Sequence, residues 1–405
     1  MNKPPPILTL IYYRVQYTHM IFKDSKLEQM FIRKNVGKGR KTLYYRVFKN
    51  IQELTGYTPT QLLQIAKDEQ KPRIENNTII FKELEDRTIT EIQYDYYNYS
   101  MQKGLKLETI KTELAAYRAF LKEYDIQLPK NIEIRINQPL YEDGDLPNKA
   151  DILRAINATN SKRNKAMFYL MSSSGIRPID IRNMKVKTFL EACKHYLEDD
   201  LTLENLYKSD YSNFIPCFYF RPQKTSKFNN VCCTFCTPET TAAIIDYLQT
   251  RPKLKEEDYL FDNGRGGQLG VTSFITIFQR LNDKEFGVNR FGDRFFQAKY
   301  LRKFFITTCN QNSSDLLKVR LLAGHSISDI DRAYNEISIP VMRRFYTKLI
   351  PHLSLNDTEV KTVKSKEYMD LENRLQEQKQ ENEKLKEELD ERINAVVENV
   401  LAKYK

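Results

Sequence analysis

A histidine and a tyrosine lie close together in the last quarter of the chain, in the segment LLAGHSISDIDRAY. His325 is one of four histidines in 405 residues, and it stands nine residues before Tyr334. A tyrosine hydroxyl can form a covalent intermediate when neighbouring groups activate it. The chain has 25 tyrosines, however, so this pair alone does not distinguish an active site from packing.

An arginine stands at a helix start in YLMSSSGIRPIDIRNMK. Pro178 suits the first position of a helix, which places Arg177 beside the positive end of the helix dipole, where an anion can bind. Asp180 follows three residues later and could orient a neighbouring group. The same residues would also fit an ordinary turn.

Two cations share one face of the helix predicted in AKYLRKFFITTC. Lys299 and Arg302 lie three residues apart, next to an apolar stripe that predicts the buried side. Two solvated cations would give the same pattern. Further on, Gly324 is expected to end a helix, and Ser328 to begin the next one, so that His325 lies in the turn between them.

Taken in order, SGIRPIDI, KYLR and LLAGH, with a tyrosine nine residues after the histidine, resemble the tyrosine recombinase family of phage-type integrases. That family has an arginine, a lysine in a β-hairpin, a His/Lys-x-x-Arg motif, Leu-Gly-His and a nucleophilic tyrosine. The resemblance assigns these places to Arg177, Lys224, Lys299, Arg302, His325 and Tyr334. Lys227 is the alternative hairpin lysine, and Asp180 stands where the family often has an acidic residue.

The resemblance covers residues 148–350, and the preceding domain resembles the family's core-binding domain in position and size. Two residues depart from the family pattern. Lys299 replaces the commoner histidine, and Ala323 separates the leucine from the Gly-His pair. The first departure bears on the role of Lys299, whereas the second leaves the motif intact.

The resemblance implies cutting and rejoining of DNA through a 3′-phosphotyrosyl link and a free 5′-hydroxyl, without metal, ATP or other cofactor. Arg177 and Arg302 would hold the non-bridging oxygens of the phosphate. Lys224 would protonate the leaving 5′-oxygen. His325 would hydrogen-bond the phosphate with help from Lys299. A homotetramer on two double-stranded DNA recombination sites is the implied assembly.

Two other functions stay open on the sequence. One is a DNA-binding or architectural protein on a decayed catalytic scaffold, although the complete set of six residues argues against decay. The other is a type IB topoisomerase-like or end-resolving enzyme, which shares the chemistry and differs in outcome.

Three further signals are interpreted as structural. Cys232, Cys233 and Cys236 have no second cysteine pair or spaced histidine, so a packed strand is favoured over a zinc site. The glycine-rich DNGRGGQLG lacks the spacing of a nucleotide-binding loop. Tyr346 lies 21 residues past His325, outside the family pattern, and is interpreted as a packing residue.

The net charge of +11 is unevenly distributed. The first 350 residues hold 54 basic and 40 acidic side chains, whereas residues 351–405 hold 10 and 13. A basic body with an acidic tail fits a polyanion-binding protein, and equally a merely soluble basic one. The segment 36–42, VGKGRKT, contains Lys38, Arg40 and Lys41 and follows Arg33 and Lys34; it could contact DNA backbone or form a solvated charged loop. Lys227 is a further candidate for DNA contact.

No apolar stretch reaches 18 residues, and the apolar start of the chain is broken by Arg14 and His19. Neither a membrane span nor a signal peptide is therefore expected. Six cysteines in a chain of this length do not make a disulfide framework. We expect a cytoplasmic, nucleoid-associated prokaryotic protein, and an origin in a virus or mobile element stays open.

The predicted fold class is mainly α with a small antiparallel β-sheet. We expect an N-terminal extension (1–23), a helical core-binding domain (24–130), a linker (131–147), a catalytic domain (148–350), a second linker (351–364) and a coiled-coil tail (365–405). In the catalytic domain a helix is expected over 178–196, and FIPCFYFRP and NVCCTFCTP are expected to pair as strands.

The tail carries a heptad pattern. One seven-residue spacing contains Tyr368, Leu375, Asn382, Leu389 and Val396, and the interleaved one contains Leu371, Gln378 and Leu385. An asparagine at a core position favours a defined register in coiled-coil dimers. A solitary charged helix is the alternative.

Overall fold

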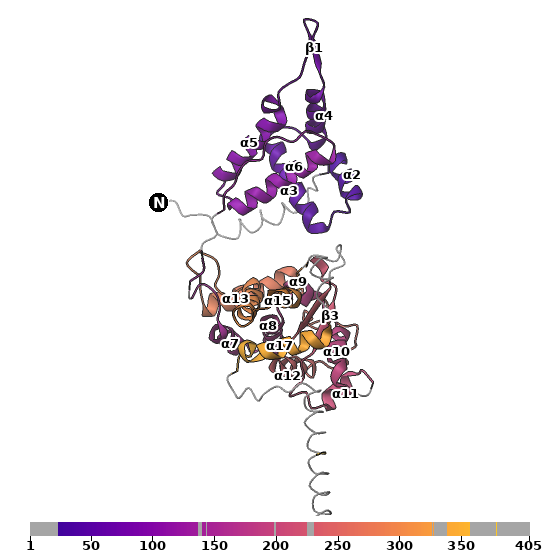
Figure 1. Ribbon diagram of the computed structural model, residues 1–405, viewed down its shortest axis with the longest axis vertical. Helices are drawn as coiled ribbons and strands as arrows, with labels where there is room; N and C mark the ends of the chain where they lie inside the picture. The colour runs from indigo at the N-terminus through magenta and orange to yellow at the C-terminus, as the bar shows by residue number, and fades with distance from the viewer. Residues whose placement is uncertain are drawn as a thin grey trace, which may run out of the picture. The chain divides into compact units, whose positions relative to one another are not determined.

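The chain folds into two compact units, Met1–Leu140 and Tyr141–Lys405, called here the N-terminal and C-terminal units. The computed structural model (Figure 1) describes residues 23–136, 140–142, 144–197, 200–224, 231–325, 327, 338–356 and 378. The predicted extension 1–23 and helix 328–336 lie outside these residues almost entirely, as does the predicted coiled coil apart from Gln378. In the described ranges no helix is both long and apolar enough to cross a membrane.

The N-terminal unit is built mainly of α-helices around one apolar core. Its helices are α2 (Ser25–Arg33), α3 (Lys38–Thr55), α4 (Pro59–Gln70), α5 (Thr88–Gln102) and α6 (Leu107–Glu123), with a short 3₁₀ turn at Leu84–Asp86. Gly56 ends α3 with a left-handed φ of 80°, and Thr58 begins α4 with a capping box. Phe48, Tyr117 and Phe120 pack in the core.

The sequence predicted a helical domain over 24–130, but the N-terminal unit also contains a small β-hairpin. Strands β1 (Arg73–Glu75) and β2 (Thr78–Ile80) form an antiparallel hairpin between α4 and α5. Asn76 and Asn77 make its two-residue turn with φ values of 50° and 59°. Asparagine tolerates this conformation better than most residues, so the Asn-Asn pair was the local signal for the hairpin.

The C-terminal unit surrounds a central buried helix. Its helices are α7 (Lys149–Asn157), α8 (Lys162–Ser174), α9 (Pro178–Asn183), α10 (Val186–Cys193), α11 (Leu203–Lys208), α12 (Pro238–Leu248), α13 (Val271–Glu285), α14 (Ala298–Gln311), α15 (Leu316–Leu322) and α17 (Ile339–Leu353), with a 3₁₀ turn at Lys194–Tyr196. Helices α7, α12 and α14 pack against α8. The predicted antiparallel pair is present as β3 (Cys217–Phe220) and β4 (Cys232–Phe235).

The single helix predicted over 178–196 is wrong. The chain leaves the helical conformation at Met184 and Lys185, between α9 and α10. The Leu260 amide donates to the Met184 carbonyl at 2.8 Å, and Lys185 forms a β-bridge with Tyr259. Tertiary pairing with a distant segment therefore overrides the local helical preference.

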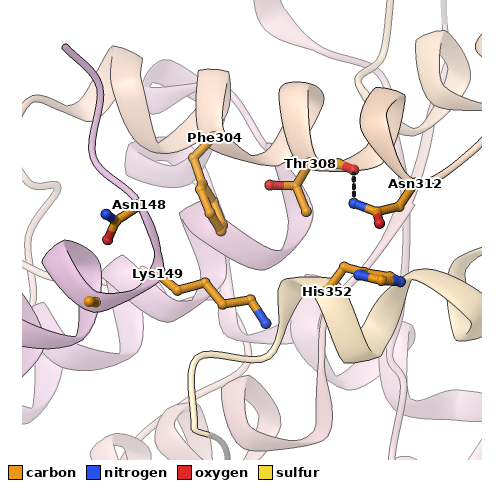
Figure 2. A pocket seen from close by; sticks show the side chains of 7 residues that line it. Asn148, Lys149, Phe304, Thr308, Asn312 and His352 are labelled. Carbon is orange, nitrogen blue, oxygen red and sulfur yellow. Dashed lines mark hydrogen bonds between the residues drawn. The ribbon is translucent and has the colours of Figure 1, made fainter. Parts of the chain in front are cut away.

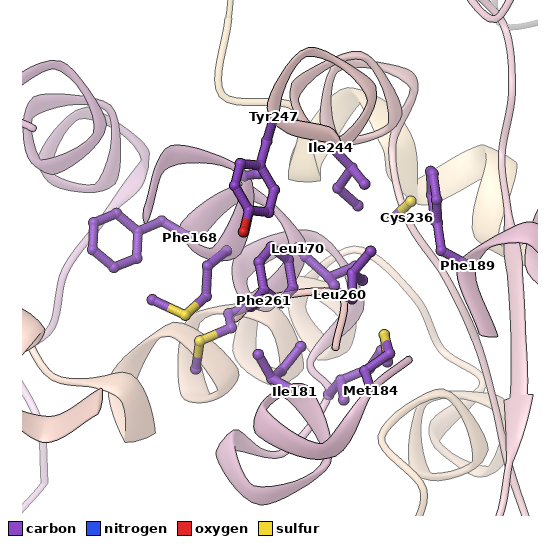
Figure 3. Close-up of a cluster of buried hydrophobic side chains, with 14 of the residues drawn as sticks. Phe168, Leu170, Ile181, Met184, Phe189, Cys236, Ile244, Tyr247, Leu260 and Phe261 are labelled. Atoms are coloured by element: carbon purple, nitrogen blue, oxygen red, sulfur yellow. The ribbon is translucent and has the colours of Figure 1, made fainter. Parts of the chain in front are cut away.

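The core of the C-terminal unit fixes α8 and the turn that follows it. Phe168 and Leu170 of α8 are fully buried, and Figure 3 shows them gathered with Ile181, Leu260 and Phe261. A helix that is buried nearly all round cannot shift without opening the core. The position of Gly175, directly after α8, is therefore set by packing.

We expect Phe168→Ala to lower the free energy of unfolding of the C-terminal unit by about 3–5 kcal/mol, because it leaves a cavity beside α8. Phe81→Ala, which removes an exposed ring, is the control and should change stability by less than about 0.5 kcal/mol. Denaturant titration measures both. Equal effects would show that the ring of Phe168 is not part of a packed core.

Candidate active site

Arg177 connects the turn after α8 with the turn after α15. It is the N-cap residue of α9, and Pro178 occupies the first helical turn, as predicted. Its Nη2 donates a hydrogen bond of 2.9 Å to the carbonyl of Gly324. The side chain is half-buried, so part of its donor fork remains accessible.

Arg302 joins the same two turns from α14. Its Nη1 donates to the Gly175 carbonyl and its Nη2 to the Ala323 carbonyl, the latter at 2.6 Å. Burial and the nearby charge of Arg177 lower its pKa to about 10. Arg177 and Arg302 together form what we call the arginine brace, in which two cations meet where solvation is poor.

The turn that carries His325 is fixed by backbone geometry. Helix α15 ends in a Schellman motif, in which His325 N–H donates to the Arg320 carbonyl and Gly324 N–H to the Leu321 carbonyl, both at 2.9 Å. Gly324 has a φ of 61°, so its predicted role in ending the helix is confirmed. A Cβ added to Gly324 would lie 2.8 Å from Cys232 Sγ.

His325 lies exposed at the end of this turn. Partial desolvation by the surrounding protein and the charges of Arg302, Arg177 and Arg320 lower its pKa from the usual 6.5. The imidazole is therefore neutral at neutral pH and can donate one hydrogen bond and accept another.

Asp180 ties α9 to the segment that follows β3. Its Oδ1 accepts a hydrogen bond of 2.8 Å from the Gln223 amide, and its carboxylate is buried. Burial raises its pKa, against the lowering effects of the Gln223 hydrogen bond and of Arg177 and Arg302. Asp180 thus holds the backbone directly before Lys224.

Lys224 follows this anchor as an exposed residue at the end of the described part of the hairpin. Residues 225–230, which include Lys227, lie outside the described residues. The choice between these two lysines therefore stays open.

Lys299 lies on the first turn of α14 and is exposed. Its Nζ is 3.3 Å from Asp293 Oδ2 and 4.6 Å from the centre of the Tyr300 ring. Burial would lower its pKa, but Tyr300 and Asp293 outweigh that effect and raise it. These contacts turn the ammonium toward Asp293, and none of its described contacts reaches the arginine brace.

Tyr334 lies outside the described residues, whereas its competitor Tyr346 is described completely. Tyr346 is fully buried in α17 and donates a hydrogen bond of 2.7 Å to the Ser173 carbonyl. Burial raises its pKa well above that of a free phenol. A buried, engaged and poorly ionisable hydroxyl is unsuited to attack DNA, so its interpretation as a packing residue is confirmed.

The basic residues of the segment 36–42 do not lie in a loop. Gly37 is the N-cap of α3, so Lys38, Arg40 and Lys41 lie in its first turn. Cations at a helix N-terminus oppose the helix dipole, so they do not serve helix stability there. Arg33 is the last residue of α2, and Lys34 is its C-cap. The Arg33 Nε and the Lys34 Nζ lie 3.4 and 2.9 Å, respectively, from the carboxylate oxygens of Glu123.

A separate cavity of about 480 Å³ lies between α7, α14 and α17 (Figure 2). Its lining comprises Asn148, Lys149, Ala150, Phe304, Thr308, Asn312 and His352. Lys149 Nζ, which points across it, donates to the Pro351 carbonyl at 2.9 Å. None of the predicted site residues lines this cavity, so it is distinct from the arginine brace.

Several supporting groups were not predicted. The carbonyls of Gly175 and Ala323 and the Gln223 amide hold the site residues in place, and Cys232 leaves no room for a side chain at position 324. Three of these four act through the backbone, which side-chain identity does not reveal. No group of three or more potential metal ligands occurs among the described residues.

No protein-family model matches the sequence, and no curated protein matches it. Solved structures do. XerA recombinase is 16% identical, with 80% of this chain and 97% of that chain covered at a TM-score of 0.34. The Tn1549 transposon integrase in complex with transposon right-end DNA is 13% identical. The match covers 79% of this chain and 96% of that chain at a TM-score of 0.45. A lambda integrase dimer bound to a COC′ core site is 13% identical. The match covers 81% of this chain and 83% of that chain at a TM-score of 0.47.

These similarities, to solved recombinases and integrases, extend over about four fifths of the chain at TM-scores below 0.5. At these TM-scores and identities the similarity assigns no chemistry to individual residues, which has to come from the contacts of this chain.

Gly324→Ala should disrupt the turn that carries His325. The new Cβ would strain a positive φ, at about 1–2 kcal/mol, and would also press on Cys232 and Arg177. Gly266→Ala is the control, because Gly266 has a φ of 78° with open space around it. We expect Gly324→Ala to be the more destabilising by about 1–3 kcal/mol in thermal or denaturant unfolding. Equal losses would show that the close approach is not restrictive.

The His325 imidazole should titrate below pH 6.5 in an NMR titration. Since its folded pKa lies below its unfolded one, protonation favours the unfolded chain, and His325 should reduce stability as the pH falls below 6.5. Arg302→Gln removes a neighbouring positive charge and should raise the midpoint. A midpoint at or above 6.5, or one unchanged by the substitution, would contradict the electrostatic coupling.

Proposed function

We propose that this protein is a DNA strand-transferring enzyme of the tyrosine recombinase type, a site-specific recombinase or integrase. The observation that carries the proposal is the arginine brace. Two guanidinium groups and a neutral imidazole converge at one turn, although Arg177, Arg302 and His325 are far apart in sequence. Such a set of donors suits a phosphate whose negative charge grows in the transition state.

In this proposal the arginine brace binds the scissile phosphate of DNA. The guanidinium forks of Arg177 and Arg302 donate to its two non-bridging oxygens. Loss of one such donor typically costs about 10²–10³ in rate. His325 donates a further hydrogen bond from its neutral ring.

Tyr334 is the proposed nucleophile. Its oxygen attacks phosphorus to form a 3′-phosphotyrosyl bond, while the bond to the 5′-oxygen breaks. A phenol has a pKa of about 10, so the positive charge of the arginine brace would assist loss of its proton. Lys224, whose backbone is positioned through Asp180, is the proposed donor of a proton to the leaving 5′-oxygen. Lys299 is assigned a supporting part, which requires it to leave Asp293.

Attack of another 5′-hydroxyl on the phosphotyrosine would rejoin the strands with the bond energy conserved. No metal or nucleotide cofactor is required for these steps. The phosphodiester bond is exchanged rather than hydrolysed, so the reaction can exchange strands between two DNA sites.

The same proposal assigns DNA contacts to the N-terminal unit. Lys38, Arg40 and Lys41 place three cations on one helix turn, which suits phosphate backbone. Residues 24–130 would serve as the core-binding domain and 148–350 as the catalytic domain. A homotetramer on two DNA sites, with the tail 365–405 able to self-associate, is the proposed assembly.

A catalytically inactive DNA-binding protein would have the same basic surfaces. Arg177 and Arg302 join two turns through hydrogen bonds, which favours the enzyme over the inactive DNA-binding protein. A binding protein needs no such positioning of cations at a single point. A type IB topoisomerase-like enzyme would use the same residues and would differ in relaxing DNA without exchanging partners.

A suicide-substrate assay tests the proposal. Nicked duplexes from the flanks of the protein's own gene should give a protein–DNA adduct that survives denaturation. Tyr334→Phe should abolish the adduct, and Arg302→Ala should slow its formation by about 10²–10³. Tyr346→Phe is the control and should retain it. An adduct that persists in Tyr334→Phe and disappears in Tyr346→Phe would overturn the assignment.

A further inference from the structure

The β1–β2 hairpin exposes a contiguous run of apolar side chains. Ile74 is 77% exposed, Ile79 65%, Ile80 43% and Phe81 58%. Figure 1 shows the hairpin extending away from the helices of its own unit. Scattered exposed apolar residues are normal, but several on one small ribbon indicate an interaction surface.

The hairpin has a defined base and a defined turn. Lys82 Nζ lies 2.5 Å from Glu69 Oε1, and Arg87 Nε donates to the Lys82 carbonyl at 3.1 Å. The Asn76–Asn77 turn fixes the other end. A two-stranded ribbon that packs on nothing is only marginally stable in water, so further strands or a covering surface would stabilise it.

The outer edge of β2 is open for pairing. Glu75 and Thr78 flank the two-residue turn, and in such hairpins the flanking pair is hydrogen-bonded, with pairs alternating from there. The backbone groups of Ile79 therefore point away from β1, and the same alternation, continued one residue past the end of β2, would point those of Phe81 the same way. Within the described ranges no hydrogen bond joins Ile79 or Phe81 to a group outside the hairpin.

The outer edge of β1 is less able to pair with another strand. Its outward-pointing positions are Ile74 and Pro72, and proline has no N–H to donate. Edge strands that carry neither proline nor charge pair readily with other strands. Of the two edges, β2 is thus the one suited to an added strand.

The absence of charged side chains on β2 favours a second copy of this chain over DNA as its partner. Residues 78–81 carry no charged side chain, so β2 has no cation to offer DNA phosphates. A second copy of the same edge would bring no like charges together. It would also place Ile79 of each copy opposite Phe81 of the other, a favourable β-branched and aromatic pair.

We infer that β2 pairs edge to edge with β2 of a second copy of this chain, antiparallel about Ile80, when both copies are bound to DNA. This register engages the outward backbone groups of both Ile79 and Phe81. It joins two hairpins into one four-stranded sheet.

The size of the contact explains why DNA is needed. Stable protein interfaces involve about 20–30 residues on each side, far more than the ribbon supplies. DNA would hold two copies near each other and so raise the effective concentration of one edge for the other. The inference therefore rests on the DNA binding in the proposed function.

Disulfide trapping tests the pairing. The N-terminal unit contains no cysteine, so Ile80→Cys introduces a single thiol there. The two-fold axis places residue 80 opposite itself, at a Cα separation of about 4.5 Å that a disulfide can span. We expect a disulfide dimer on linear duplex fragments from the flanks of the protein's own gene, and at least tenfold less of it without DNA. Ile74→Cys, on the far strand, is the control and should give none.

A second variant separates pairing from DNA binding. Ile79→Pro removes an outward N–H that β1 does not use. In the Ile80→Cys background it should reduce the dimer at least tenfold and leave the affinity of a single bound copy for DNA in a gel shift unchanged.

Two results would overturn the inference. One is DNA binding without any Ile80→Cys dimer, and the other is equal trapping of Ile74→Cys. If the dimer is absent and Ile79→Pro also weakens binding of a single copy to DNA, the ribbon contacts DNA instead. A wild-type chain that binds none of the fragments would instead overturn the proposed function, and pairing on DNA with it.

Discussion

The hydrogen bonds of the arginine brace are the constraint on which the candidate site depends. Arg177 reaches the turn after α15, and Arg302 reaches both that turn and the turn after α8. The acceptors are main-chain carbonyls, whose positions follow from the packing of the helices that precede them. Movement of either turn would therefore displace both cations at once, and the apolar core around α8 indirectly controls where an anion can bind.

The brace also concentrates positive charge in a poorly solvated place. The low pKa of Arg302 and the low pKa of His325 have the same cause, since each group loses solvation and faces the charge of its neighbours. Asp180 offsets only part of this charge. A bound phosphate would relieve the repulsion, so the site is electrostatically prepared for an anion before one arrives.

Much of this arrangement could be predicted from the sequence, because several residues carry local signals. Pro178 marks the start of α9, and Gly324 marks the end of α15. What the sequence did not reveal depends on contacts between distant segments. The break at Met184 comes from pairing near Tyr259, and the tie between Asp180 and Gln223 uses a main-chain amide. Lys299 had the right spacing to join the site, yet its neighbours turn it toward Asp293.

The Schellman turn at the end of α15 has a consequence for where catalytic hydrogen bonds can originate. Its two N–H groups, on Gly324 and His325, are already satisfied by carbonyls of their own helix. The turn therefore offers no main-chain oxyanion hole, unlike sites in which free amides surround a reacting group. Among the described residues of this turn, stabilisation of an anion has to come from side chains, because the amides of Gly324 and His325 cannot replace a missing guanidinium.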